Sequence, residues 1–155
     1  MKTYCLVLIF LTFCFVISAC NECSDTGDAA ITPPLRFSIV DSAGKNLVDK
    51  TQSHYSADTI RLFDLEEKQW IVLSREYLPL AGGFVFSGDF RKNRRGKSSL
   101  LLQLNSVDSD TLDAWYRLIN DKCASVYEFT RFEHNGQELV KSPQTPALLL
   151  IPKSK

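Results

Sequence analysis

The sequence predicts an all-β protein, an antiparallel β-sandwich of about eight strands. Apolar and polar residues alternate along several short runs, such as Leu35–Ile39, and this alternation is the pattern of half-buried strands. An Asn135-Gly136 pair separates two runs, and turn residues recur between the others at the spacing typical of a sandwich. We therefore expect a single β-sandwich domain over residues 35–155.

The first predicted strand is Leu35–Ile39, and the polar stretch 41–46 after it is typical of a turn. The next strand covers residues 60–65, and its apolar residues change faces midway: Ile60 and Leu62, then Phe63 and Leu65. Such a switch indicates a bulge or a strand that is buried on both sides. Trp70–Leu73 is interpreted as one short apolar strand, and the glycines at 82–83 interrupt the pattern that follows.

Two apolar runs, Phe84–Phe90 and Ser98–Asn105, are predicted to form a hairpin that is closed by the loop Arg91–Lys97. In the second run the leucines fall at every second position and share one face: Leu100, Leu102 and Leu104. That spacing indicates a strand with one buried face.

Residues 109–120 fit both a helix and a strand. A helix would carry an apolar stripe made of Leu112, Trp115 and Ile119. A strand would carry one face made of Leu112, Ala114, Tyr116 and Leu118. The aromatic and β-branched residues favour the strand, with the helix kept as the alternative.

A further hairpin is predicted where Val126–His134 and Gln137–Val140 flank Asn135-Gly136. Both central residues of a type I′ turn need a positive φ, which asparagine and glycine tolerate. Ala147–Ile151 is wholly apolar and is predicted to be a buried closing strand that ends at Pro152.

The first 19 residues are typical of a signal peptide. Lys2 supplies a positive charge, and residues 4–17 form an apolar run of about 14, shorter than the ~20 that span a bilayer. The last residues resemble the bacterial lipobox: Ile17-Ser18-Ala19-Cys20. This resemblance implies that the thiol of Cys20 is lipidated and anchors the mature chain in a membrane. The alternative is an ordinary secretory leader that is cut near Ala19.

The mature chain would be nearly neutral. The whole sequence has 18 Lys and Arg against 18 Asp and Glu, so loss of Lys2 leaves 17 against 18 and a net charge of −1. This balance gives no argument for nucleic acid as a partner. Residues 20–34 are predicted to be the lipidated cysteine and a flexible polar tether, which ends in Pro33-Pro34. The acidic residues of this tether resemble the export signal of surface lipoproteins in Bacteroidota, and the alternative is a plain linker: Glu22, Asp25 and Asp28.

Two cysteines besides Cys20 remain after the leader, namely Cys23 and Cys123. In an oxidising compartment they could form a disulfide. Such a bond would close a loop of about 100 residues and contribute about 4–5 kcal/mol in the chain-entropy model. The alternative, a free thiol at Cys123 and an unpaired Cys23, stays open.

No pattern in the sequence points to catalysis, a metal or a cofactor. His54 and His134 have no partner at the spacing of zinc ligands. Asp108, Asp110 and Asp113 lack the glycine and the closing glutamate of a calcium loop and are interpreted as a solvated turn. Neither a nucleophile elbow nor a phosphate-binding glycine loop occurs. We therefore expect no catalytic residue and no enzymatic activity.

The loop 91–97 carries the densest charge of the chain, in the side chains of Arg91, Lys92, Arg94, Arg95 and Lys97. One interpretation is an anion-binding tip for lipid head groups or an acidic glycan. The other is a solvated loop that discourages strand pairing. Several aromatic residues could likewise stack on sugars, but their strand-like spacing favours the core: Trp70, Tyr77, Trp115, Tyr116 and Tyr127.

Three short Asp-Ser/Thr-apolar motifs resemble the O-glycosylation site of exported Bacteroidota proteins, and their acceptors would be Ser42, Thr59 and Thr111. The alternative is a turn that precedes a strand. The layout of the chain as a whole resembles small lipoproteins of Bacteroidota. The likeness rests on the lipobox, the tether, the opening run 33–41 with Gly44-Lys45-Asn46, the run 58–62, and Tyr127–Thr130 with Asn135-Gly136.

This resemblance implies an immunoglobulin- or transthyretin-like sandwich and a place in the outer membrane, facing the periplasm or exposed on the surface. It transfers no catalytic residue. We expect a lipid-anchored, non-enzymatic envelope protein that binds a protein or glycan partner. The alternative is a structural envelope component that contacts anionic lipid or lipopolysaccharide through the loop 91–97.

Overall fold

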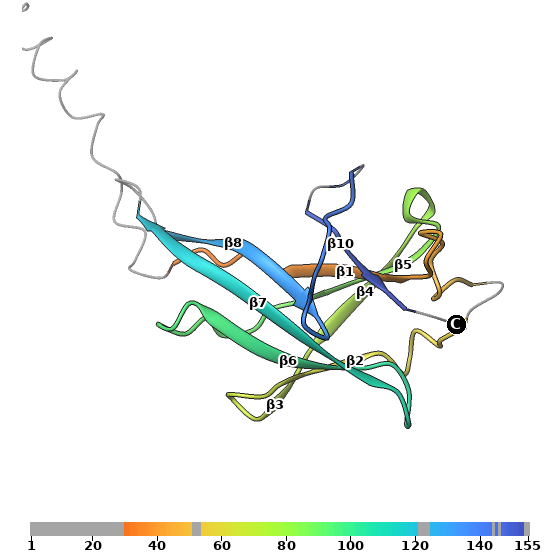
Figure 1. The fold of residues 1–155 in the computed structure, drawn as a ribbon, viewed down its shortest axis with the longest axis horizontal. Helices are drawn as coiled ribbons and strands as arrows, with labels where there is room; N and C mark the ends of the chain where they lie inside the picture. The colour runs from red at the N-terminus through yellow and green to blue at the C-terminus, as the bar shows by residue number, and fades with distance from the viewer. Residues whose placement is uncertain (1–29, 51–53, 121–124, 144, 146, 154–155) are drawn as a thin grey trace, which may run out of the picture.

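The computed structural model describes residues 30–50, 54–120, 125–143, 145 and 147–153, and it shows two β-sheets packed face to face (Figure 1). The prediction of an all-β sandwich is confirmed, whereas its immunoglobulin- or transthyretin-like type stays a prediction. The predicted leader, the lipidation site at Cys20 and the pair Cys23 and Cys123 lie outside the described residues.

The first sheet has four strands in the order β10-β1-β5-β4. Its edge strand β10 runs parallel to β1, and the other pairs are antiparallel. The bounds of these strands are β1 Leu35–Val40, β4 Leu73–Leu78, β5 Gly83–Gly88 and β10 Leu149–Pro152. A single 3₁₀ turn, η2 (Pro79–Ala81), joins β4 to β5.

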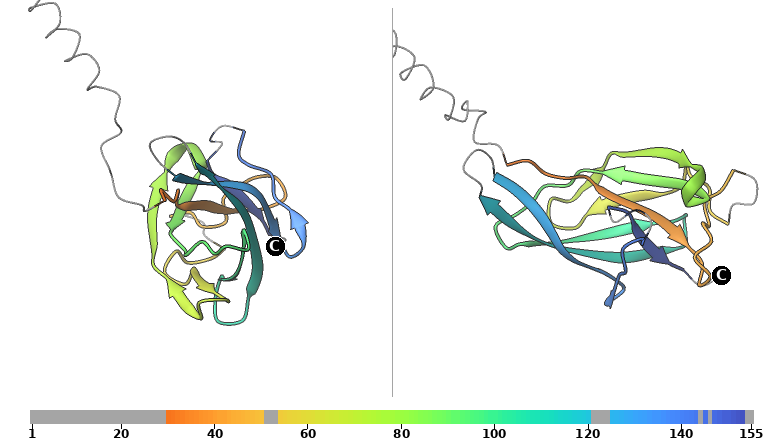
Figure 2. Two further views of the ribbon diagram at one scale, coloured as in Figure 1. Left: turned by 90° about the vertical axis from the view of Figure 1, so that its left-hand side faces the viewer. Right: turned by 90° about the horizontal axis from the view of Figure 1, so that it is seen from above.

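The second sheet has six antiparallel strands in the order β3-β2-β6-β7-β8-β9. Their bounds are β2 Arg61–Asp64, β3 Gln69–Ile71, β6 Lys97–Gln103, β7 Ser109–Asn120, β8 Ser125–His134 and β9 Gln137–Glu138. The long strands β7 and β8 extend well past the other strands at one end of the molecule (Figure 2).

The core lies between the two sheets and follows the period-two pattern of the sequence. Phe37 and Phe86 are paired across β1 and β5, and their rings stack with centroids 5.4 Å apart. The second sheet contributes fully buried leucines from alternate positions: Leu62, Leu100, Leu102 and Leu112. Burial of each such side chain contributes about 1.5–3 kcal/mol, so these faces hold the sheets together.

The segment 109–120 is a strand, as preferred, and it contains an irregularity of register between Trp115 and Tyr116. The predicted turn between β8 and β9 is also confirmed, since Asn135 has φ 50° and Gly136 has φ 79°. Both values lie in the left-handed region that the Asn-Gly pair was expected to supply.

The prediction of one strand at Trp70–Leu73 is wrong. Val72 is 90% exposed and separates β3 from β4, which belong to different sheets. The apolar run therefore crosses from one sheet to the other. The face switch predicted for residues 60–65 is also absent, because β2 ends at Asp64 and Leu65 lies exposed in the following turn.

The predicted hairpin of Phe84–Phe90 with Ser98–Asn105 is wrong as well. β5 pairs with β1 and β4, whereas β6 pairs with β2 and β7. The loop 91–97 is consequently a crossover between the sheets and not a hairpin tip. A sequence pattern identifies a strand by its alternation, but two consecutive strands look alike whether they pair or face each other across the core.

Candidate functional site

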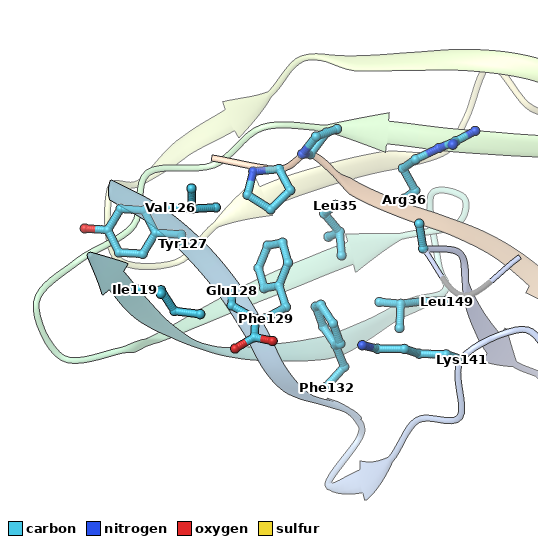
Figure 3. Close-up of a pocket in the computed structure, with 13 residues that line it drawn as sticks. Leu35, Arg36, Ile119, Val126, Tyr127, Glu128, Phe129, Phe132, Lys141 and Leu149 are labelled. Carbon is cyan, nitrogen blue, oxygen red and sulfur yellow. The ribbon is translucent and has the colours of Figure 1, made fainter. Parts of the chain in front are cut away.

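A groove of about 450 Å³ opens between the edge of β8 and the neighbouring strands β1 and β10. The rings of Tyr127, Phe129 and Phe132 follow one another along β8, and Leu35 and Leu149 lie opposite (Figure 3). The remaining lining residues are Pro33, Pro34, Arg36, Ile119, Val126, Glu128, Lys141 and Ala147. The groove is mostly apolar, with charged side chains at intervals, as ligand sites commonly are.

The groove results from the way the chain enters the fold. Ile31 pairs with Val126 in a parallel bridge: its N–H donates to Ser125 O (2.8 Å), and Tyr127 N–H donates to Ile31 O (3.0 Å). The next residues include Pro33-Pro34, which have no N–H to continue this ladder. The chain therefore leaves β8 and joins the other sheet as β1, and the groove lies between these two strands.

Charges at the groove differ in how far they are neutralised. Glu128 accepts from Arg117 Nε (2.8 Å) and lies 2.7 Å from Arg117 NH2, so its carboxylate is paired. Arg36 and Lys141 have no ionic partner among the residues that the structure describes. Lys141 therefore leaves one uncompensated positive charge at the groove, whereas the side chain of Arg36 points away from it on the opposite face of β1 from Leu35 (Figure 3).

Most cations of the loop 91–97 are engaged within the fold. Arg91 lies 3.6 Å from Glu67, and Lys97 lies 3.0 Å from Asp113 and 4.7 Å from the ring centre of Trp115. Arg94 and Arg95 are exposed and have no ionic partner within the described part of the chain. The predicted patch of five cations thus presents two uncompensated charges.

Lys92 is the least ordinary of these cations. Its ammonium group lies 3.7 Å from the ring centre of Phe90 and 4.9 Å from that of Phe129, and it donates to Phe90 O (3.0 Å). Burial lowers the pKa of Lys92 to about 8, because desolvation disfavours the ammonium ion. Lys92 therefore points into the molecule and contributes little to an external anion site.

A cluster of polar side chains lies at the opposite end of the sandwich, and we call it the Asp110 cluster: Tyr55, Asp108, Asp110, His134 and Lys153. Lys153 Nζ donates to Asp108 Oδ1 (2.8 Å) and to Asp110 Oδ2 (2.8 Å). His134 Nε2 lies 3.1 Å from Asp110 Oδ2, and Tyr55 donates to Asp108 Oδ2 (2.8 Å). The prediction of a solvated turn is wrong for Asp110, which is 6% exposed, and for Asp113, since both lie within the strand β7.

The pKa values of the Asp110 cluster reflect this pairing. Burial by itself raises the pKa of Asp110, but hydrogen bonds from Lys153, Asn135 and His134 outweigh it and leave the pKa below its ordinary value. Lys153 is the converse case, since its bonds to the two carboxylates outweigh desolvation and raise its pKa. Burial and the bond to Asp108 raise the pKa of Tyr55 to about 12.

The sequence reading missed both the Asp110 cluster and the groove. The cluster joins residues from four separate segments, and no local spacing connects Tyr55 or Lys153 to Asp110. The one local signal for the groove is Pro33-Pro34, which the composition of residues 20–34 places in the predicted tether. Among the aromatic residues predicted for the core, Tyr116 is buried and Trp70 is 52% exposed.

The candidate glycosylation residues Ser42, Thr59 and Thr111 all lie on the surface. The hydroxyl of Thr59 is held by the carbonyl of Leu104 (2.6 Å). The described residues contain no group of three or more His, Cys, Asp and Glu side chains arranged for a metal. They also contain no helix that is long and apolar enough to cross a membrane.

The groove and the Asp110 cluster therefore have to be interpreted from their own geometry. No model of a known family matches the sequence, and no significant match was found among the curated proteins or among the solved structures.

Proposed function

We propose that this chain is a lipid-anchored, non-enzymatic protein of the bacterial outer membrane that binds a protein or glycan partner. The lipid on Cys20 is its anchor, and the groove between β1 and β8 is its binding site. The observation that carries the proposal is the groove itself, a mostly apolar site of about 450 Å³ with the unpaired cation Lys141 at its mouth. Sites of this size and lining are the usual place for a ligand.

The position of the groove supports this assignment. Ile31 enters the fold directly beside it, so the site lies at the part of the domain that is nearest in sequence to Cys20. A partner held in the same membrane would meet this region first. The Asp110 cluster is a weaker candidate, because its charged groups bond to one another.

Site-specific photo-cross-linking in intact cells tests the proposed function. A photoreactive amino acid replaces Glu128 at the groove, and the matched control carries it in place of Glu76, an exposed residue of β4. We expect a discrete adduct that depends on the Glu128 position. No adduct, or the same products from both positions, would reject the groove as the binding site.

The anchor is tested separately. Cys20→Ala should abolish fatty-acid labelling and release the protein from membranes. Retention of both properties in the variant would rule out the lipidation at this residue. Protease treatment of intact cells then determines exposure: digestion of the domain is expected for surface display, and protection is expected for a periplasmic location.

A second candidate function, contact with anionic lipid or lipopolysaccharide, is favoured by one observation. Arg94 and Arg95 are exposed and lie in a loop whose Gly96 carbonyl accepts from Tyr116 N–H of β7 (2.9 Å). Ile31 is bridged to Val126, which pairs with Ile119 near the end of the same strand. Each uncompensated cation near an anionic surface contributes about 1 kcal/mol. If replacement of both arginines by serine leaves binding to anionic liposomes unchanged, this candidate is rejected.

A further inference from the structure

We infer that the groove binds an extended polypeptide segment of a partner protein, which adds a strand to the outer edge of β8. This inference rests on the proposed function and names the partner class for the same site. It excludes a glycan as the ligand of the groove.

The first argument is the open edge of β8. Ile31 occupies this edge at Val126, and β9 occupies it at Glu133 and His134. Between these positions, residues 128–131 have no strand partner on their outer side within the described ranges. An exposed strand edge presents backbone donors and acceptors that an extended peptide can pair with.

The second argument is the facing edge of β1. Its pairing with β10 begins at Phe37 and Leu149, so Leu35 and Arg36 have no strand partner on that side in the described part of the chain. The groove therefore lies between two stretches of strand edge. A polypeptide can satisfy hydrogen-bonding groups on both sides, whereas the mostly apolar lining offers a glycan few polar side chains.

The chain already uses this binding mode once. Ile31 forms a strand-like pair with β8, and Pro33-Pro34 then prevent its own segment from continuing along the edge. Residues 128–131 are the continuation that the chain itself leaves open. An incoming segment without proline can extend the same ladder.

The side chains define which segment fits. Every second residue of an extended strand points the same way, so alternate apolar residues of the partner can enter among Phe129, Phe132 and Leu35. Lys141 at the mouth favours a carboxylate in a flanking position (Figure 3). We therefore expect a segment in which apolar and acidic or polar residues alternate.

The test measures binding of a synthetic octapeptide to the full-length protein in detergent by fluorescence anisotropy. The peptide alternates valine with threonine and carries an aspartate near each end. Its matched control has the same side chains but N-methyl groups on alternate backbone amides, which removes one row of donors. If strand addition holds, methylation should weaken binding about tenfold, as expected for the loss of about two backbone hydrogen bonds. Equal binding of both peptides, or binding of neither, overturns the inference.

The charge of Lys141 gives a second readout. The variant Lys141→Ser should bind the octapeptide about fivefold more weakly, because it loses one exposed ionic contact at the groove. A matched control removes another exposed cation, with Lys45→Ser, and should bind as the original protein does. Equal weakening in both variants contradicts a role for the groove.

Competition separates this inference from the proposed function. Isolated membranes that carry the photoreactive residue at position 128 are irradiated with and without the octapeptide. Loss of the adduct supports strand addition, whereas an adduct that persists, or that only a glycan displaces, overturns strand addition and leaves the proposed function standing. An adduct that proves to be a second copy of this chain also overturns the inference, and absence of any adduct rejects the proposed function itself.

Discussion

The two ends of β7 differ in how the sheets meet. At its beginning, Lys153, which follows β10 of the first sheet, bonds to Asp110 of the second sheet. Near its far end, the strands β1 and β8 separate and the groove opens between them. The first end is closed by buried ionic contacts between the sheets. The second end carries exposed apolar side chains, among them Ile31 at 60% and Leu118 at 45%. The difference predicts that substitutions cost more stability at the Asp110 cluster than at the groove end.

The sharpest test of this contrast uses two leucines of the same strand. Leu112 is fully buried and pairs with His134, whereas Leu118 is half exposed and pairs with Tyr127. Leu112→Ala should lower the free energy of unfolding by about 2–5 kcal/mol through lost burial and a cavity. Leu118→Ala should cost less than about 1 kcal/mol. Urea denaturation of both variants measures the difference, and equal losses would refute the uneven distribution of stability.

The next prediction concerns the buried ion pair. Asp110→Ala leaves Lys153 with Asp108 alone and should lower the free energy of unfolding by about 3 kcal/mol. The control is Asp58→Ala, because Asp58 forms an ion pair with Arg75 whose side chains are largely exposed. Its loss should cost no more than about 1 kcal/mol. Thermal and urea denaturation measure both losses of stability. Similar losses in the two variants would show that the Asp110 cluster does not stabilise this end of the sandwich more than a surface ion pair does.

A smaller effect is expected when acid neutralises Asp110 without removing its side chain. The pKa of Asp110 in the folded protein lies below the ordinary value of 3.8, so the unfolded chain binds the proton first. The resulting stability is fully present above about pH 4 and is lost as the pH falls through the folded pKa. Denaturation between pH 6 and pH 3 should therefore show a decline in the original protein that is reduced in Asp110→Asn.

The smallest predicted effect is a gain in stability, from a substitution of Lys92, whose ammonium group lies near Phe129 of the groove. The pKa of Lys92 is about 8 in the fold and 10.5 as its ordinary value, so the unfolded chain binds more protons between these values and stability rises with pH there. Lys92→Met removes the buried charge and should stabilise the protein by about 1 kcal/mol at pH 7. Thermal denaturation at pH 7 and pH 9 should show a gain that shrinks at the higher pH.

Local patterns predicted individual strands well. Leu100, Leu102 and Leu104 alternate and are fully buried, and Asn135-Gly136 forms the turn that its backbone preferences require. Pairing could not be read in the same way, because strand partners are set by packing across the core. The predicted hairpin at 91–97 is consequently a crossover between the two sheets.

The candidate site was harder to predict for a related reason. The groove exists because Ile31 pairs with one sheet and Leu35 begins a strand of the other, and this separation is a property of the assembled sheets. The Asp110 cluster likewise depends on Lys153 and Tyr55, which approach Asp110 only after folding. The spacing of residues along the sequence therefore predicts neither the groove nor the Asp110 cluster.

The parallel pairing of β1 with β10 has a consequence for the timing of folding. These are the first and last strands of the described domain, and they lie side by side. The four-stranded sheet therefore cannot be completed until nearly the whole chain is available, and such non-local contacts form slowly. For a chain that is exported as proposed, this delay would keep it extended during passage through the inner membrane and postpone closure of the sandwich until it has arrived.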